Sequence, residues 1–452
     1  MHFLVVPTSR GFSLSVRGDR WQADHCEFRF PPHVWQAFEA KEALVNELAY
    51  VTTLASPLIL KHDRTLYNTA PPRFLQFYRH CFEGAIPNLV EPIVDEDATE
   101  ILTRVRGVRR QFQGPSATAD VPLVDGWMPE RVVLPFTFGK DSLLSLAVLN
   151  ALGLEVIPVY VDERVLPRAN AMRKGLEKRL LADQGLRVER VENEIQLLSD
   201  YQVLERPETR LYQVQVYFIY LLSMLPFCWA YRAPVIVLSS EFVNSLDTVH
   251  RQGYVCPHRY MQSPPVIKGL AKMAQDLSGG QVTAVNLIGT LGNFAVHRLL
   301  HTEFPRFGQY QLSCHLEVTR FTRWCHDCYR CAQAYLFWSA LGMAPRRQGF
   351  EEGLLTEAKR GLFSLFNPEV HRRDVYRRFV GDEEMLAFLM AARNGVQEPL
   401  VERFRVSCGK AAARGEKKLK KRIFRHQGKP GRHPLEQEAA RLLEKYLAGY
   451  RE

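Results

Sequence analysis

The first part of the chain changes from strand-like to helix-like spacing of its apolar residues. Helical spacing is found from residue 34 to about residue 54 and again over residues 72–82. Before these helices, alternating or continuous apolar positions between turn residues predict three β-strands, at residues 3–6, 12–16 and 26–30. We therefore expect an N-terminal α+β domain over residues 1–126, ending in a linker of turn-forming residues at 111–126.

The next part of the chain alternates strands with helices. Apolar runs predict buried strands at residues 132–136, 156–161, 187–191 and 235–239. Helical spacing lies between them, at residues 142–152, 168–184 and 211–231. Strands that alternate with helices need crossover connections, which give a mainly parallel sheet covered on both faces. We expect an α/β domain over residues 127–345.

Beyond this domain the pattern is helical, including residues 384–394 and 434–450. We expect a helical C-terminal extension over residues 346–452. The most apolar stretch of the chain, residues 214–230, is interrupted by Pro226 and is shorter than the ~20 apolar residues that a bilayer span needs. It therefore predicts a buried helix and no membrane span.

Length and composition agree with two or three globular domains. The chain has 452 residues, of which 46% are hydrophobic and 24% charged. Its first residues lack the basic region and cleavage site of a signal peptide, so we expect a cytoplasmic protein. Four of the nine cysteines lie between residues 314 and 331, which suits a metal site in a reducing compartment better than a disulfide framework.

The formal net charge of +10 comes from one segment. Residues 405–432 carry eleven Lys or Arg and a single acidic residue, Glu416, so the remaining chain is neutral. Such a run is most often a solvated face. An acidic partner or an RNA is the alternative, although Phe424 is the only aromatic residue there for RNA recognition by stacking. The oligomeric state is left open by the sequence.

A phosphate-binding turn is predicted between residues 132–136 and the helix that follows. Gly139 lets the backbone approach an oxyanion, Lys140 supplies positive charge, and Ser142 can donate its hydroxyl while it caps the helix. This combination suits pyrophosphate, and an ordinary strand-to-helix turn is the alternative. The expected nucleotide-binding residues are Thr137, Phe138, Gly139, Lys140, Asp141 and Ser142, and the expected catalytic residues are Lys140, Asp141 and Ser142.

Four cysteines in the pattern Cys314-x10-Cys325-x2-Cys328-x2-Cys331 are expected to bind a metal. Four thiolates are typical of a tetrahedral structural Zn²⁺, because the protein would fill every coordination position. The Cys-x2-Cys-x2-Cys spacing also occurs in iron–sulfur sites, and four unligated cysteines are a third alternative. We expect a zinc lobe at residues 312–334.

Residues 133–142 resemble the PP-loop of the N-type ATP pyrophosphatases, whose usual form is Ser-Gly-Gly-x-Asp-Ser. Thr137 and Phe138 depart from this form, and the Phe-Gly-Lys-Asp-Ser version is also similar to that of the sulfonucleotide reductases of the same superfamily. The resemblance implies an adenine-nucleotide hydrolase-like fold with ATP across the C-terminal ends of the strands. Asp162 would then lie near the ribose or a Mg²⁺ ion, with a solvated acidic loop as the alternative.

The cysteine motif extends the resemblance. Residues 132–342 resemble 7-cyano-7-deazaguanine synthase, the queuosine-pathway enzyme that adenylates a deazaguanine carboxylate and converts it with ammonia to amide and nitrile. The front domain, the Gly-Lys-Asp-Ser loop and the Trp-Cys-x2-Cys-x2-Cys segment are also similar to the muropeptide glutamate epimerases, which adenylate a UDP-linked muramoyl dipeptide. Residues 238–245 and 258–263 are similar to that group too, and depart from it at Phe242 and Val243.

Both resemblances imply the same first step, in which a carboxylate attacks the α-phosphate of ATP and pyrophosphate leaves. ATP, Mg²⁺ and Zn²⁺ are the implied cofactors, and the implied substrate is a small-molecule or protein-terminal carboxylate. Glu241, Asn244 and Ser245 follow a strand at the edge where open α/β sheets bind ligands, so we expect them to contact substrate. A deazaguanine carboxylate is the first expectation, with a partner-linked role in antiphage defence. The muramoyl dipeptide and a tRNA base are the alternatives.

Overall fold

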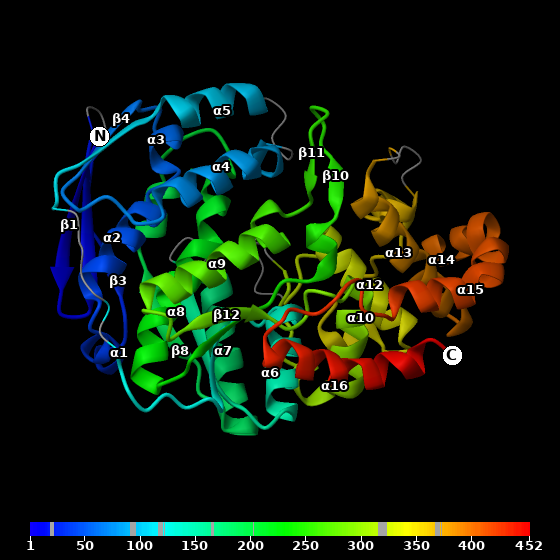
Figure 1. The fold of residues 1–452 in the computed structure, drawn as a ribbon. Coiled ribbons are helices and arrows are strands. Elements are labelled where there is room, and N and C mark those ends of the chain that lie inside the picture. Colours follow the sequence, from blue (N-terminus) through cyan, green and yellow to red (C-terminus); the bar gives the residue numbers. More distant parts are fainter. Residues whose placement is uncertain are drawn as a thin grey trace.

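The structure of the chain is a computed structural model (Figure 1). It describes residues 1–18, 22–90, 96–115, 121, 123–163, 167–201, 203–314, 323–366, 371 and 373–452.

A ten-stranded sheet passes through the molecule in the order β12-β9-β6-β7-β8-β3-β2-β1-β4-β5. Six pairs of neighbouring strands are parallel, and the pairs β8–β3, β3–β2 and β2–β1 are antiparallel. The predicted mixed α/β fold with a mainly parallel sheet is therefore confirmed. The strands are β1 (His2–Thr8), β2 (Gly11–Arg17), β3 (Gln22–Arg29), β4 (Arg64–Tyr67), β5 (Arg109–Phe112), β6 (Arg131–Pro135), β7 (Glu155–Glu163), β8 (Glu189–Asn193), β9 (Val235–Leu238) and β12 (Thr283–Asn286).

The five parallel strands from β12 to β8 have a reversal point in their order. From β6 the chain proceeds outward to β7 and β8, and it then returns to the other side of β6 to form β9 and β12. In open α/β sheets, ligands bind outside the carboxyl ends of the strands at such a point. The loops that follow β6 and β9 are therefore the ones that the topology brings together.

The two faces of the sheet have separate cores because side chains alternate along each strand. Val133 of β6 belongs to one core and Val132 and Leu134 to the other. The first face is covered by the N-terminal helices with α8 and α9, and the second by α6, α7 and the C-terminal helices. These N-terminal and central helices are α1 (Pro32–Ala37), α2 (Lys41–Thr52), α3 (Ser56–Ile59), α4 (Leu75–Val90), α5 (Ala98–Gly107), α6 (Lys140–Ala151), α7 (Pro167–Gln184), α8 (Val216–Tyr231) and α9 (Pro264–Leu277).

The apolar segment Leu211–Tyr231 is long and apolar enough to cross a membrane, but 72% of its most apolar window is buried inside the structure. Its helix α8 packs between β6 and β7 on one side and α1 and α2 on the other. It is therefore a core helix of this fold.

The N-terminal strands continue the sheet across the expected boundary near residue 126. Phe28 and Arg29 of β3 pair with Asn193 and Glu192 of β8, in antiparallel register. Arg29 also forms ion pairs with Glu192 at 2.6 Å and Glu194 at 3.0 Å. The first 112 residues thus build the outer half of the sheet.

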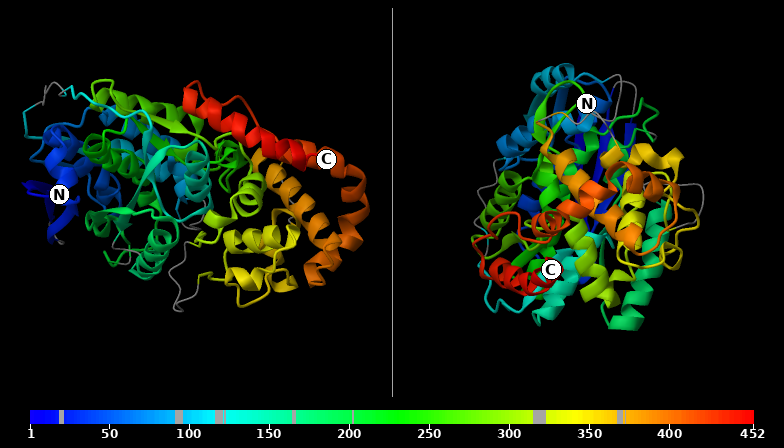
Figure 2. Two further views of the ribbon diagram at one scale, coloured as in Figure 1. Left: turned by 90° about the horizontal axis from the view of Figure 1, so that it is seen from below. Right: turned by 90° about the vertical axis from the view of Figure 1, so that its right-hand side faces the viewer.

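The C-terminal helices gather at the end of the molecule opposite the N-terminal strands (Figure 2). They are α10 (Asn293–Arg298), α11 (Pro305–Gly308), α12 (Tyr329–Ala340), α13 (Val375–Arg393), α14 (Pro399–Phe404), α15 (Lys410–Ile423) and α16 (Pro434–Tyr450). The helices expected at 384–394 and 434–450 correspond to α13 and α16. Helix α16 packs on α6 and β12, and its Glu436 accepts a hydrogen bond from the Asn286 amide at 3.1 Å. The C-terminal extension therefore shares a core with α6.

Candidate active site

The turn after β6 is closed by hydroxyl groups. The Ser142 hydroxyl donates to the Gly139 carbonyl at 3.1 Å and accepts from the Thr137 amide at 3.4 Å. The Gly139 amide donates to Thr137 Oγ1 at 3.4 Å, and Gly139 is the N-cap residue of α6. Ser142 therefore holds the turn together at the N-terminus of a twelve-residue helix, where backbone amides and the helix dipole favour an anion.

Phe138 has a backbone φ of 60°, in the left-handed region that favours glycine. Its ring is fully buried and packs against Phe136, with 4.6 Å between ring centroids and an angle of 58° between the ring planes. The usual PP-loop form has glycine at this position. The conformation explains the preference for glycine, and burial of the ring explains how this chain tolerates Phe.

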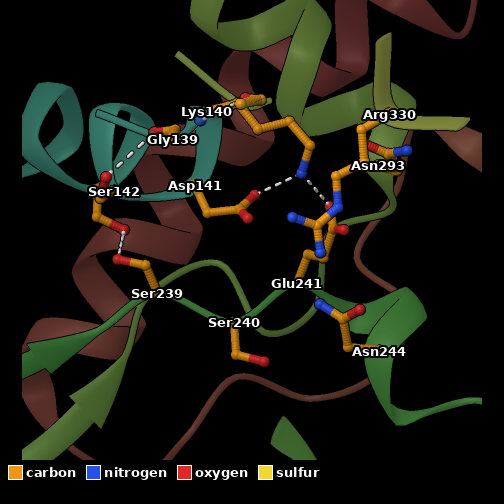
Figure 3. A network of polar contacts seen from close by, with 12 residues as sticks. Gly139, Lys140, Asp141, Ser142, Ser239, Ser240, Glu241, Asn244, Asn293 and Arg330 are labelled. Carbon is orange, nitrogen blue, oxygen red and sulfur yellow. Dashed lines mark hydrogen bonds and ion pairs between the residues drawn. The ribbon is translucent and has the colours of Figure 1, made fainter. Parts of the chain in front are cut away.

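Lys140 joins the two loops at the reversal point of the sheet. Its ammonium group lies 2.6 Å from Asp141 Oδ1 and 2.7 Å from Glu241 Oε2 (Figure 3). Burial by itself lowers the pKa of Lys140, but the two carboxylates outweigh this effect and raise it, so the ammonium group stays charged. Burial raises the pKa of Glu241. The predicted residues of the β6 loop and Glu241 of the β9 loop are thus brought together.

The loop after β9 is fixed by amide side chains. Asn244 donates to Gln262 Oε1 at 2.7 Å, and the Ser240 hydroxyl contacts the same oxygen at 3.2 Å. The Ser245 hydroxyl donates to the Phe242 carbonyl at 2.7 Å, within its own turn. Asn244 therefore lies with Glu241 at the site (Figure 3), whereas the Ser245 hydroxyl is engaged in a local turn.

Asp162 lies at the carboxyl end of β7 and pairs with Arg190 of β8 at 2.6 Å. Arg190 also pairs with Glu177 of α7 at 2.8 Å. The acidic residue that was expected to contact nucleotide is thus held in a buried ion-pair network at the same edge of the sheet. Its contact with the nucleotide stays a prediction.

The four cysteines converge on one point. Their sulfur atoms lie within 4.8 Å of one another, with 3.6 Å between Cys325 and Cys331 and 3.5 Å between Cys328 and Cys331. A tetrahedral site with Zn–S bonds of ~2.3 Å has sulfur–sulfur edges of about 3.8 Å. The cluster can therefore hold a single metal ion such as zinc.

The segment that leads to the cysteine cluster is hydrogen-bonded directly to the turn after β6. The Leu312 amide donates to the Phe138 carbonyl at 2.7 Å, and the Lys140 amide donates to the Ser313 hydroxyl at 3.4 Å. Cys314 follows these residues, and the neighbouring His326 accepts a hydrogen bond from the Glu351 amide at 3.1 Å. A metal at the cysteines would therefore fix the irregular segment at residues 312–314, which contacts the turn after β6.

Two arginines that were not predicted complete the site. Arg330 lies between Cys328 and Cys331 in the chain, and its guanidinium group lies on the same side of the site as the Asp141 and Glu241 carboxylates, which attract it without a direct ion pair (Figure 3). Arg259 belongs to the segment whose Gln262 holds Asn244. The spacing of the cysteines predicted a metal site. It gave no sign that Arg330, which lies between two of the cysteines, also belongs to the candidate site.

No protein-family model, curated protein or solved structure matches the chain. Its function is therefore inferred from the residues of the site and their geometry.

Proposed function

We propose that the chain is an ATP pyrophosphatase of the PP-loop type that activates a carboxylate by adenylation. The observation that carries this proposal is the meeting of the Gly139–Lys140–Asp141–Ser142 turn with Glu241 at the reversal point of a parallel sheet. A helix N-terminus and a lysine there favour a bound pyrophosphate group.

In the proposed step, a carboxylate oxygen bonds to the α-phosphorus of ATP, and the bond from that phosphorus to the bridging oxygen of the leaving pyrophosphate breaks. The backbone amides at the start of α6 and the Lys140 ammonium group stabilise the charge on the leaving group. Lys140 exchanges one carboxylate partner for a phosphate oxygen when ATP binds. Catalysis then consists mainly of positioning and electrostatic stabilisation.

Mg²⁺ is expected to accompany ATP. The Asp141 and Glu241 side chains offer carboxylate oxygens, which are the ligands that Mg²⁺ prefers, and both already face one cation in Lys140. Mg²⁺ would supply positive charge to the phosphates. We propose Zn²⁺ for the four cysteines, with a structural role.

A 7-deazaguanine carboxylate is the first proposed substrate. The second candidate is the terminal glutamate of a UDP-linked muramoyl dipeptide, and one contact favours it. The two segments that resemble the epimerases, residues 238–245 and 258–263, pack on each other through Asn244 and Gln262. Their association at the site supports a common role in binding the acid.

The test is pyrophosphate release from Mg-ATP, with 7-carboxy-7-deazaguanine and the UDP-muramoyl dipeptide ending in L-Glu supplied in parallel. We expect release with one acid, and a loss of 100-fold or more in the Ser142→Ala and Lys140→Met variants, by analogy with the loss of one charge-stabilising group. Lys272→Met is the matched control, because Lys272 is exposed on α9, where it pairs with Asp276. Failure of the wild-type protein to release pyrophosphate with either acid would contradict both substrate proposals.

A further inference from the structure

Arg259 and Arg330 point their guanidinium groups at one oxygen atom. Arg259 Nη2 lies 3.3 Å from Tyr329 Oη, and Arg330 Nε lies 3.0 Å from the same oxygen. Two cations that share one neutral phenol stand side by side and repel each other. A phenol can accept hydrogen bonds from both, but it cannot neutralise either charge.

The described residues provide no carboxylate within ion-pairing distance of either guanidinium group. The carboxylates that Arg330 approaches, Asp141 and Glu241, already hold Lys140. Placing an arginine away from water without an anion is costly, so such residues are ordinarily paired. Among the described residues, neither arginine therefore has a carboxylate of its own in a direct ion pair, although Asp141 and Glu241 attract Arg330 from a longer distance.

The two arginines are partly enclosed by protein. Arg259 and Arg330 each keep part of their surface accessible, as do Tyr217 and Tyr376 beside them. Burial is nevertheless the largest cause of the raised pKa of Tyr217 and Tyr376, so protein surrounds these side chains on most sides. His258 stacks on Tyr376 with 3.5 Å between ring centroids and adds a flat wall.

The arginine pair adjoins the proposed reaction site and lies apart from the turn after β6. In Figure 3, the Arg330 guanidinium group lies between the Asp141 carboxylate and Asn244, on the side of Lys140 away from Ser142. The nucleotide phosphates have their own amides and Lys140 at the turn. An anion bound at Arg330 would therefore approach the α-phosphate of ATP from the side opposite to the turn after β6.

We propose that Arg259 and Arg330 form an oxyanion subsite that binds a carboxylate of the acid substrate, with Tyr217 and Tyr376 as its walls. The two guanidinium groups are planar and carry several N–H donors each. They suit a planar carboxylate, which can accept parallel hydrogen bonds. This assignment rests on the proposed function for the identity of the anion. It makes the two arginines the determinants that select an acid for activation.

The experiment measures equilibrium binding by calorimetry to the full chain, with three probes. These are the acid that releases pyrophosphate, a non-hydrolysable Mg-ATP analogue, and inorganic sulfate as a general oxyanion. The variants are Arg259→Gln, Arg330→Gln and the corresponding Lys substitutions. Arg106→Gln is the matched control, because Arg106 is exposed and pairs with Glu83.

We expect each Gln variant to weaken binding of the acid and of sulfate by about 10-fold or more, the effect of losing a charged hydrogen bond, with nucleotide affinity changed less than about twofold. The Lys variants should recover only part of the loss, because lysine lacks the planar fork. In the absence of ligand, the Gln variants should unfold at the same or a higher temperature, since each removes a repelling cation.

Unchanged binding of acid and sulfate in the Gln variants would overturn the subsite. Lost affinity for the ATP analogue alone would also overturn it and would assign the arginines to the nucleotide. If neither acid releases pyrophosphate, the proposed function fails, and sulfate still decides the subsite. Sulfate binding that disappears with either arginine supports an oxyanion site, and binding that persists refutes it.

Discussion

Phe138 has a left-handed backbone conformation, which destabilises the fold, and a buried aromatic ring, which stabilises it. We expect Phe138→Gly to relieve about 1–2 kcal/mol of left-handed strain and to lose about 3–5 kcal/mol of buried aromatic packing. The free energy of unfolding should therefore fall by about 2–3 kcal/mol in urea titrations, while pyrophosphate release persists because the turn keeps its shape. An increase in stability would show that the strain outweighs the packing.

Glu47 gives the protein a pH-dependent stability. It is buried on α2 and accepts hydrogen bonds from Tyr78 Oη and the Arg73 amide, both at 2.5 Å. Burial raises its pKa from 4.5 to about 7. Between these values the folded state binds more protons than the unfolded state, so the contribution of Glu47 to stability is full below pH 4.5 and declines as the pH rises to 7.

Glu47→Gln should remove this contribution to the pH dependence. Relative to the variant, we expect the wild-type protein to lose about 3 kcal/mol of unfolding free energy between pH 4.5 and pH 7. Chemical denaturation of both proteins at several pH values measures the difference, and other buried acids cancel in the comparison. Parallel pH profiles for the two proteins would assign the titration to another group.

Local sequence predicted the turn between β6 and α6 because Gly139, Lys140 and Ser142 lie within one turn of chain, and phosphate binding there stays a prediction. Arg259 and Arg330 could not be predicted in the same way, since they are 71 positions apart and meet only through Tyr329. The contact between Lys140 and Glu241 also could not be predicted from local sequence, because it depends on the order of the strands, which brings the two loops together. Side chains that meet through tertiary contacts leave no pattern in one sequence.

At the scale of elements, the metal-binding lobe is expected to stiffen the phosphate loop through Leu312 and Ser313. We predict one Zn²⁺ per chain by elemental analysis. Cys328→Ser or removal of the metal by a chelator should lower the Tm by several degrees and weaken nucleotide binding, because metal binding contributes directly to folding. Cys408→Ser, outside the cluster, is the matched control, and an iron signal in place of zinc would contradict the assignment.

Strands with a continuous apolar run were predicted, and short strands of mixed composition were missed. The strands expected at 132–136, 156–161, 187–191 and 235–239 correspond to β6, β7, β8 and β9. The strands β4 and β12 have four residues, like β9, but they mix polar and apolar positions and so show no apolar run. The basic segment contains the helix α15, where Glu416 pairs with Arg393 at 2.5 Å and with Lys420 at 3.5 Å.

At the scale of the whole molecule, the basic helix α15 is part of the C-terminal core. Its Ala412 and Ile423 are buried, whereas Lys417, Lys418 and Lys421 are exposed. Deleting the segment would remove core residues, so charge reversal is the cleaner test. We expect the triple Lys→Glu variant to keep its stability and pyrophosphate release, as for a solvated face. A steep, salt-dependent loss of tRNA affinity would instead identify an RNA-binding surface.

Helix α16 covers β12, although 150 residues separate Asn286 from the Glu436 that contacts it. At ribosomal speeds of about 5–20 residues per second, β12 emerges roughly 8–30 s before its cover is made. During that interval the edge of the sheet and the apolar side of α6 have no partner from this helix. We therefore expect a chaperone to bind the nascent chain during this interval. Slower translation between Asn286 and Glu436 should make folding depend more strongly on that chaperone.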